Sequence, residues 1–106
     1  HVACALESID GNIYTGICID MPCSIGLCAE QSAIAEMLKN GKTQITKLIA
    51  VYEDGSILPP CGRCREFISQ LDNNNYETKI LLPTLRETSL NKLLPERWDD
   101  KWNYDN

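Results

Sequence analysis

Two cysteine-containing segments, each at the beginning of a helical pattern, constrain the fold of this chain more than any other feature of its sequence. The first is Cys28-Ala29-Glu30 and the second is Pro60-Cys61-Gly62-Arg63-Cys64. The backbone N–H groups and the dipole of a helix N-terminus favour negative charge, so they stabilise a thiolate placed there. The sequence therefore predicts a fold in which two helix N-termini meet and three thiolates share one metal ion.

The residue types of these two segments are typical of a catalytic zinc site. We interpret Cys28, Cys61 and Cys64 as zinc ligands, because three protein ligands leave the fourth position of zinc to a water molecule. Zinc lowers the pKa of that water to roughly 7. Glu30 follows two residues after Cys28, a spacing that lets its carboxylate face the water without binding the metal. We expect Glu30 to act as a general acid and base that shuttles protons.

The cysteines and Glu30 also have other interpretations. The chain has six cysteines in 106 residues, which is compatible with a disulfide framework or with free buried thiols. Cys4 and Cys18 lie in apolar, strand-like contexts that favour core packing. Cys-x-x-Cys alone is also a redox motif, and Cys23 is a candidate fourth ligand for a structural zinc site. Glu30 alone also suits a helix N-terminus.

The rest of the chain alternates strand-like and helical patterns. Asp10-Gly11 between two short β-rich runs predicts a hairpin, and a continuous apolar run around Leu48 predicts a strand buried on both faces. Ser89 is a candidate N-cap for a final helix. We expect strands at 2–6, 12–18, 45–52 and 79–82, helices at 28–39, 60–71 and 90–94, and a loop at 20–26. Strand–helix–strand alternation predicts an α/β fold with parallel neighbours after the leading antiparallel hairpin.

The length and charge of the chain narrow its organisation and its partners. A chain of 106 residues suits one domain, 1–106, and its first residues already have a strand pattern, so we expect a further N-terminal segment before them. The net charge is −5 without a basic cluster, which argues against nucleic acid and leaves a small neutral or cationic substrate. Neither a long apolar run nor a signal peptide is visible, so we expect a soluble, cytoplasmic protein without a membrane partner.

The paired motifs also carry a family resemblance. A ligand-x-Glu segment followed by Pro-Cys-x-x-Cys is the signature of zinc deaminases. On these residues, and over most of its length as far as Leu93-Leu94-Pro95, the chain resembles the small all-cysteine cytidine deaminases and the related blasticidin S deaminase. The resemblance implies a three-layer α/β/α fold with a mixed sheet and one zinc ion per chain. It also implies a homotetramer that converts a cytidine-type aminopyrimidine nucleoside to its uridine-type product with release of ammonia.

The resemblance also implies substrate-binding residues. The N–H of Ala29 would bind the ring carbonyl, and the carbonyl of Pro59 would accept a hydrogen bond from the departing amine. Asp20 and Cys18 stand where the family binds the ribose, although a thiol in place of the family's Asn cannot make the same hydrogen bonds. Trp98 corresponds to a terminal aromatic that covers a neighbouring subunit's site, or else fills the core. Two alternatives stay open: a deaminase of another amine-bearing base or nucleoside antibiotic, and a non-catalytic zinc-stabilised domain.

Overall fold

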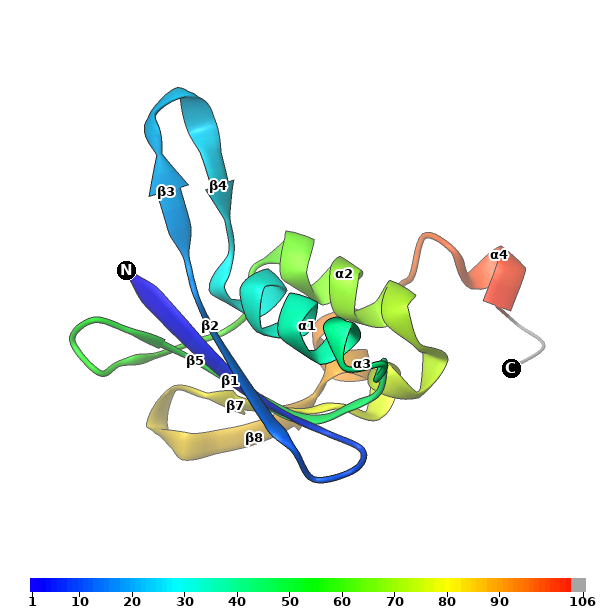
Figure 1. The fold of residues 1–106 in the computed structure, drawn as a ribbon. Coiled ribbons are helices and arrows are strands. Elements are labelled where there is room, and N and C mark those ends of the chain that lie inside the picture. The colour runs from blue at the N-terminus through cyan, green and yellow to red at the C-terminus, as the bar shows by residue number, and fades with distance from the viewer. Residues whose placement is uncertain (104–106) are drawn as a thin grey trace.

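The structure, a computed structural model, describes residues 1–103 and is built on a mixed sheet with helices packed against it (Figure 1). The strands are β1 (Val2–Ser8), β2 (Ile13–Ile17), β3 (Ile19–Met21), β4 (Ile25–Leu27), β5 (Ile45–Tyr52), β6 (Ile57–Leu58), β7 (Lys79–Leu82) and β8 (Arg86–Ser89). The α-helices are α1 (Ala29–Lys39), α2 (Gly62–Leu71), α3 (Leu90–Leu93) and α4 (Asp100–Asn103). The short 3-10 helices are η1 (Pro22–Ser24), η2 (Asn73–Glu77) and η3 (Pro83–Leu85).

The strand order confirms the α/β class and the mixed sheet. The main sheet runs β2-β1-β5-β7-β8, and β6 pairs with β5. β1 is antiparallel to both β2 and β5. β2 and β5 are therefore parallel to each other with β1 between them, and α1 lies in the connection from β2 to β5. Among the described strands, β5 and β7 are the only parallel pair that is directly hydrogen-bonded. The parallel part of the sheet is therefore smaller than strand–helix–strand alternation alone predicts.

The hydrophobic core lies between the sheet and the helices. Alternate strand residues face the helices, as period-two strand geometry requires. The fully or almost fully buried apolar core residues include Cys4, Leu6, Leu48 and Ile80 from strands and Ala33, Ile34, Met37, Ile68 and Leu90 from helices. Figure 1 shows α1, α2 and α3 on the same face of the sheet. Residues 1–103 thus supply one helical layer, and they place no helix over the opposite face.

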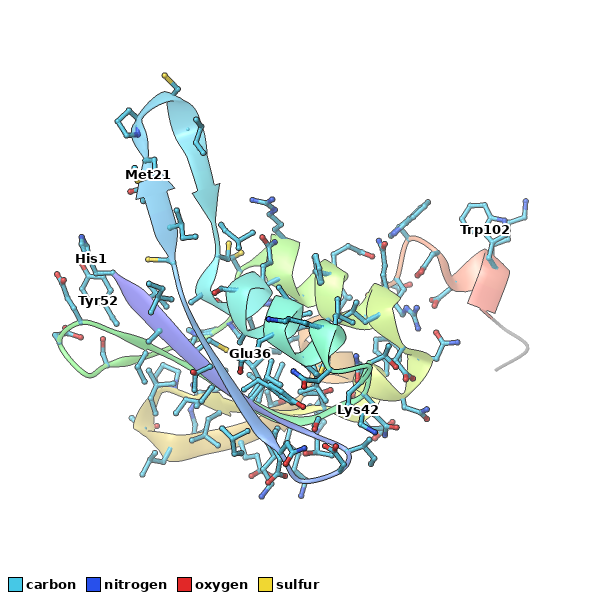
Figure 2. The ribbon with its side chains drawn as sticks, in the orientation of Figure 1. His1, Met21, Glu36, Lys42, Tyr52 and Trp102 are labelled. Carbon is cyan, nitrogen blue, oxygen red and sulfur yellow. The ribbon has the colours of Figure 1, made fainter. Side chains whose placement is uncertain are left out.

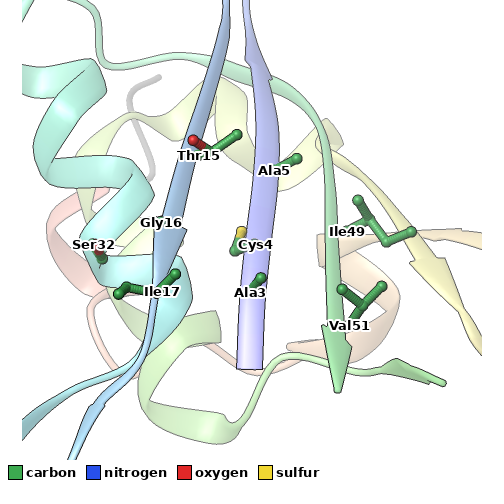
Figure 3. Close-up of a pocket in the computed structure, with 9 residues that line it drawn as sticks. All are labelled: Ala3, Cys4, Ala5, Thr15, Gly16, Ile17, Ser32, Ile49 and Val51. Atoms are coloured by element: carbon green, nitrogen blue, oxygen red, sulfur yellow. The ribbon is translucent and has the colours of Figure 1, made fainter. Parts of the chain in front are cut away.

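The opposite face of the sheet is open and carries an apolar groove of about 490 Å³ (Figure 3). Ala3 and Ala5 lie along the middle of the groove on β1, with Ile17 of β2 on one side and Ile49 and Val51 of β5 on the other. The small alanine side chains between larger ones produce the hollow.

A hairpin arm replaces the predicted loop at 20–26. Ile19 pairs with Leu27 and Met21 with Ile25 in the two-stranded β3–β4 sheet. The arm projects from the body of the molecule, and Met21 lies far out along it (Figures 1 and 2). The loop prediction is therefore wrong.

Two turns in the structure share a conformation that no signal in the sequence indicates. The η1 turn at the tip of the arm and the η3 turn before β8 each begin with proline. In each turn the next two residues have positive φ: Cys23 and Ser24 in η1, and Thr84 and Leu85 in η3. Positive φ normally favours Gly, Asn or Asp, and none of these marks the two turns. The strands that follow them, β4 and β8, were therefore absent from the sequence-based expectation.

The remaining predicted elements agree with the structure within a few residues. β5 and β7 have the predicted bounds, and α1, α2 and α3 cover most of the three predicted helices. Ser89 is at the N-cap position of α3, but its hydroxyl donates to Asn91 Oδ1 (2.7 Å) and makes no capping bond. Ser89 thus occupies the predicted N-cap position, but its side chain does not form the capping hydrogen bond that the prediction implies. Among residues 1–103, no helix has the length and apolar character needed to cross a membrane.

Candidate metal centre and active site

The N-termini of α1 and α2 meet, as their sequences predict. Cys28 is the N-cap residue of α1 and Cys61 is the N-cap residue of α2. Their backbones are nearly identical, with φ −69° and ψ 150° at Cys28 and φ −69° and ψ 169° at Cys61. The first-turn N–H groups of a helix have no partner within the helix. Both cysteines are thus placed where these N–H groups favour a thiolate.

The three sulfur atoms are close enough to bind one ion. The Sγ atoms of Cys28, Cys61 and Cys64 all lie within 4.8 Å of one another. The Cys61 and Cys64 sulfurs are 3.6 Å apart, close to the separation of about 3.8 Å that tetrahedral Zn–S bonds of about 2.3 Å require. Among the described residues, this group has no fourth Cys, His, Asp or Glu. The donor set fits zinc with one ligand position left for water.

The other cysteines do not support the disulfide or structural-zinc interpretations. All six cysteines are free thiols. Cys23 is exposed in the η1 turn at the tip of the arm, outside the sulfur cluster. Cys4 is buried in the core and Cys18 packs against it, as their strand-like contexts predict.

The thiols of the cluster differ in acidity. Burial raises the pKa of Cys64, and the nearby Glu30 carboxylate raises it further. Burial also raises the pKa of Cys28. At Cys61 burial acts in the same direction, but hydrogen bonds from the backbone and side chain of Cys64 outweigh it and lower the pKa. Three thiolates beside a carboxylate therefore need a cation to coexist.

A pocket of about 200 Å³ opens on this cluster. It is lined by Val2, Cys18, Cys28, Ala29, Glu30, Ala50, Leu58, Pro59 and Cys61. Glu30 is only 5% exposed, so its side chain lies in an environment poor in water. Four residues singled out in the sequence, Glu30, Ala29, Pro59 and Cys18, thus share one pocket with two of the cysteines.

Two other residues singled out in the sequence lie elsewhere. Asp20 is exposed on β3 and is not part of the pocket lining. Trp98 is 65% exposed and packs edge to face on Trp102, with ring centroids 5.4 Å apart. The interpretation of Trp98 as a core-filling residue is therefore wrong. Within this chain, neither Asp20 nor Trp98 forms part of the site.

Sequence reasoning missed three wall residues, namely Val2, Ala50 and Leu58. Leu58 belongs to the two-residue strand β6 and pairs with Ala50 of β5. A strand this short leaves no periodic pattern in the sequence. Val2 donates its backbone N–H to the Cys18 sulfur at 3.2 Å. Only the pairing of β1 with β2 and β5, and of β5 with β6, brings these residues to the cluster.

Comparison with known proteins agrees with this geometry. The family described as "Cytidine and deoxycytidylate deaminase zinc-binding region" matches residues 1–77. A cytidine deaminase from Sporosarcina psychrophila is 32% identical over 97 residues, which are 89% of this chain and 71% of that protein. One from Aliivibrio fischeri is 30% identical over 104 residues, which are 95% of this chain. The chain spans only 33% of that longer relative.

Solved structures give the same result. The crystal structure of cytidine deaminase from Mycobacterium tuberculosis superposes with a TM-score of 0.82 at 30% identity, covering 92% of this chain and 77% of that one. The cytidine deaminase of Bacillus anthracis gives a TM-score of 0.80 at 27% identity, covering 98% of this chain and 79% of that one. The arrangement of strands and helices is therefore shared with these proteins.

Proposed function

The chain belongs to the cytidine and deoxycytidylate deaminase family, and from that membership we propose that it is a zinc-dependent hydrolase that deaminates a cytidine-type nucleoside. Water would replace the exocyclic amine of the pyrimidine, giving the uridine-type product and ammonia. One observation carries the proposal: three cysteine sulfurs lie within 4.8 Å of one another, and two of these cysteines, Cys28 and Cys61, line a pocket together with the buried Glu30.

Each residue of the cluster has a role in this reaction. Cys28, Cys61 and Cys64 would hold the zinc ion, which when bound supplies a water with a pKa near 7. Glu30 would take a proton from this water and deliver it to the ring nitrogen, and then carry a second proton to the departing amine. Its burial supports this role, because proton transfer then occurs between groups that bulk water does not separate.

Backbone groups at the pocket would orient the base. The N–H of Ala29 is in the first turn of α1 and has no helical partner, so it can donate to the ring carbonyl. Pro59 lines the same pocket, and its carbonyl would accept from the departing amine. The thiol of Cys18 would contact the sugar side of the substrate, and Asp20 would reach it only if β3 moves or another part of the protein completes the site.

The proposal is tested with zinc-loaded protein and a substrate panel of cytidine, deoxycytidine, blasticidin S and guanine. The ultraviolet absorbance should fall at wavelengths where cytidine absorbs more strongly than uridine, and ammonia should be released. Glu30→Gln should reduce kcat by about 10²–10⁴-fold while zinc content stays at one per chain. Glu36→Gln is the matched control, because Glu36 is exposed on the same helix. A zinc-replete wild-type protein that leaves both pyrimidine nucleosides unchanged overturns the proposal.

We further propose that residues 1–106 act as one domain within a homo-oligomer, with a tetramer favoured. The open apolar groove of the sheet and the exposed Ile19, Met21 and Ile25 of the arm support an assembly. Trp98, exposed on its tail, would then cover a neighbouring subunit's pocket. A cytoplasmic location is proposed because six free thiols, three of them zinc ligands, persist best in a reducing compartment.

A further inference from the structure

Arg65 connects the metal-binding turn, residues Pro59 to Cys61, to a distant part of the chain. It lies in the first turns of α2, directly after Cys64. Its guanidinium Nε donates to the carbonyl of Pro60 at 2.7 Å, and its Nη1 donates to the carbonyl of Leu93 at 3.2 Å. One planar side chain therefore joins the residue before Cys61 to the last turn of α3.

The turn that Arg65 holds has few hydrogen bonds of its own. Pro59 and Pro60 have no backbone N–H, so these two residues can form backbone hydrogen bonds only through their carbonyl groups. Arg65 binds two successive carbonyls there, because its backbone N–H donates to Cys61 at 3.0 Å and its side chain donates to Pro60. Pro60 is fully buried, so loss of the side-chain bond would leave a buried carbonyl without this partner.

The other end of the connection is firmly anchored. The carbonyl of Leu94, next to Leu93, accepts from the hydroxyl of Tyr76 at 2.7 Å. The Arg97 guanidinium lies over the Tyr76 ring, 4.9 Å from its centroid, and Arg97 is only 9% exposed. Arg65 thus ties the metal-binding turn to a fixed point, and this point lies outside the metal site.

We infer that Arg65 is a positioning residue of the metal centre, which holds the Pro59–Cys61 turn so that the Cys61 sulfur and the Pro59 carbonyl face the pocket. The inference rests on the proposed zinc ligand set. Arg65 acts through geometry, because its two bonds use different nitrogens of a rigid fork that Lys cannot reproduce. Partners that orient metal ligands in this way typically change metal affinity or activity by 10–100-fold when they are substituted.

The test compares Arg65→Gln and Arg65→Lys with the wild type and with Arg63→Gln. Arg63 is exposed in the first turn of the same helix, so its substitution removes an equal charge without the two carbonyl bonds. Zinc affinity is measured by competition with a chromophoric chelator. Cobalt(II)-loaded proteins report ligand geometry through their visible absorption bands. Circular dichroism establishes that each variant is folded.

Both Arg65 variants should bind zinc about 10–100-fold more weakly and show altered cobalt bands, whereas Arg63→Gln should match the wild type. Wild-type affinity and bands in Arg65→Gln and Arg65→Lys overturn the inference. Wild-type zinc affinity and cobalt bands in Arg65→Lys, with weakened binding in Arg65→Gln, also overturn the inference, because the charge and not the geometry of Arg65 would then be responsible. If Arg65→Gln does not fold, Arg65→Lys decides by the same criteria. A wild-type protein that binds neither metal through thiolates overturns the proposed function instead, so the two failures are distinguishable.

Discussion

At the scale of single residues, the thiol of Cys18 is the most unusual group in the pocket wall. The other lining side chains, apart from Glu30 and the ligand cysteines, are apolar: Val2, Ala29, Ala50, Leu58 and Pro59. The Cys18 sulfur already accepts a hydrogen bond from the Val2 N–H, and this bond lowers the pKa of Cys18. The thiol is also a weak hydrogen-bonding group, so it can contribute little directional binding to a substrate.

We therefore predict that Cys18→Ala raises KM by at most about fivefold, equivalent to about 1 kcal/mol, and leaves kcat unchanged. An equal contribution to substrate and transition state appears in KM alone. Steady-state kinetics on zinc-loaded protein measures both constants, and Cys23→Ala at the exposed tip of the arm is the control. A tenfold fall in kcat would show that Cys18 takes part in the chemistry itself.

A second residue-scale prediction concerns the buried thiol of Cys4. Burial, with a smaller effect of the Glu30 charge, raises the pKa of Cys4 from 9.0 to about 12. Because the pKa is raised in the folded state, the contribution of the protonated Cys4 thiol to the stability of the fold is complete below pH 9 and is lost as the pH rises through 12. The free energy of unfolding should fall in this window by up to about 1.4 kcal/mol per pH unit.

Cys4→Ala should be less stable at neutral pH, because it leaves a small cavity, but should lose less stability between pH 9 and pH 11. Urea unfolding of the two proteins across this range isolates the Cys4 contribution, since every other titrating group is common to both. If the free energies of unfolding of the wild type and Cys4→Ala fell equally with pH above pH 9, the assignment of a buried, protonated thiol would be contradicted.

At the scale of elements, the contact between α1 and β2 sets the position of Glu30. Gly16 of β2 lies directly under the helix. A Cβ added there would come within 2.3 Å of the Ala33 nitrogen and 2.7 Å of the Ala29 carbonyl oxygen. These are backbone atoms, so the helix itself would have to move.

Gly16→Ala should therefore destabilise the protein by about 1–3 kcal/mol and weaken zinc binding, because α1 carries Cys28 and Glu30. Gly62→Ala is the matched control: its added Cβ meets nothing within 4 Å, and alanine is favoured over glycine in a helix by up to about 1 kcal/mol. Denaturant unfolding and chelator competition measure both effects. A Gly16→Ala protein as stable as the wild type would mean that α1 can slide without cost.

The same elements explain what could be predicted from the sequence. The start of each long helix carries its own local signal in an N-cap cysteine, so the meeting of Cys28 with Cys61 and Cys64 was predictable. The strands β5 and β7 were predictable from continuous apolar runs. The arm and β8 were not, because their turns depend on positive φ at ordinary residues such as Cys23 and Thr84. The roles assigned to individual site residues stay predictions.

The contacts of Arg65 mark a further limit of sequence reasoning. Nothing in the sequence pairs this side chain with the carbonyl of Leu93, which lies 28 residues further along the chain. Such a bond depends on where α3 ends relative to α2, and that position follows from packing of the whole core. Wall residues such as Leu58 were missed for the same reason, since only sheet pairing brings them to the pocket.

At the scale of the whole molecule, the proposed metal centre would join two parts of the chain that are distant in sequence. Cys28 precedes α1, whereas Cys61 and Cys64 belong to the start of α2, and β5 and β6 lie between them in the sequence. A ligand that binds the folded protein and not the unfolded chain stabilises the fold by an amount set by its concentration relative to Kd. Zinc bound to these three sulfurs should therefore stabilise the entire domain.

We predict that free zinc at 100 times its Kd raises the free energy of unfolding by about 2.7 kcal/mol, and that chelation reverses the change. Without the ion, the Cys28 and Cys64 thiols keep their protons, because burial raises the pKa of both. The cluster then loses the bonds that hold α1 to α2. Thermal unfolding at several fixed zinc concentrations measures the effect.

Two cysteine variants separate this stabilisation from general thiol–metal binding. Cys28→Ser should lose most of the zinc-dependent increase in Tm, because a serine hydroxyl is a poor zinc ligand beside two thiolates. Cys23→Ser removes an exposed thiol at the tip of the arm, outside the sulfur cluster, and should keep the full increase. If instead Cys23→Ser abolishes the increase and Cys28→Ser retains it, the ion is held by the arm and not by the paired helix N-termini.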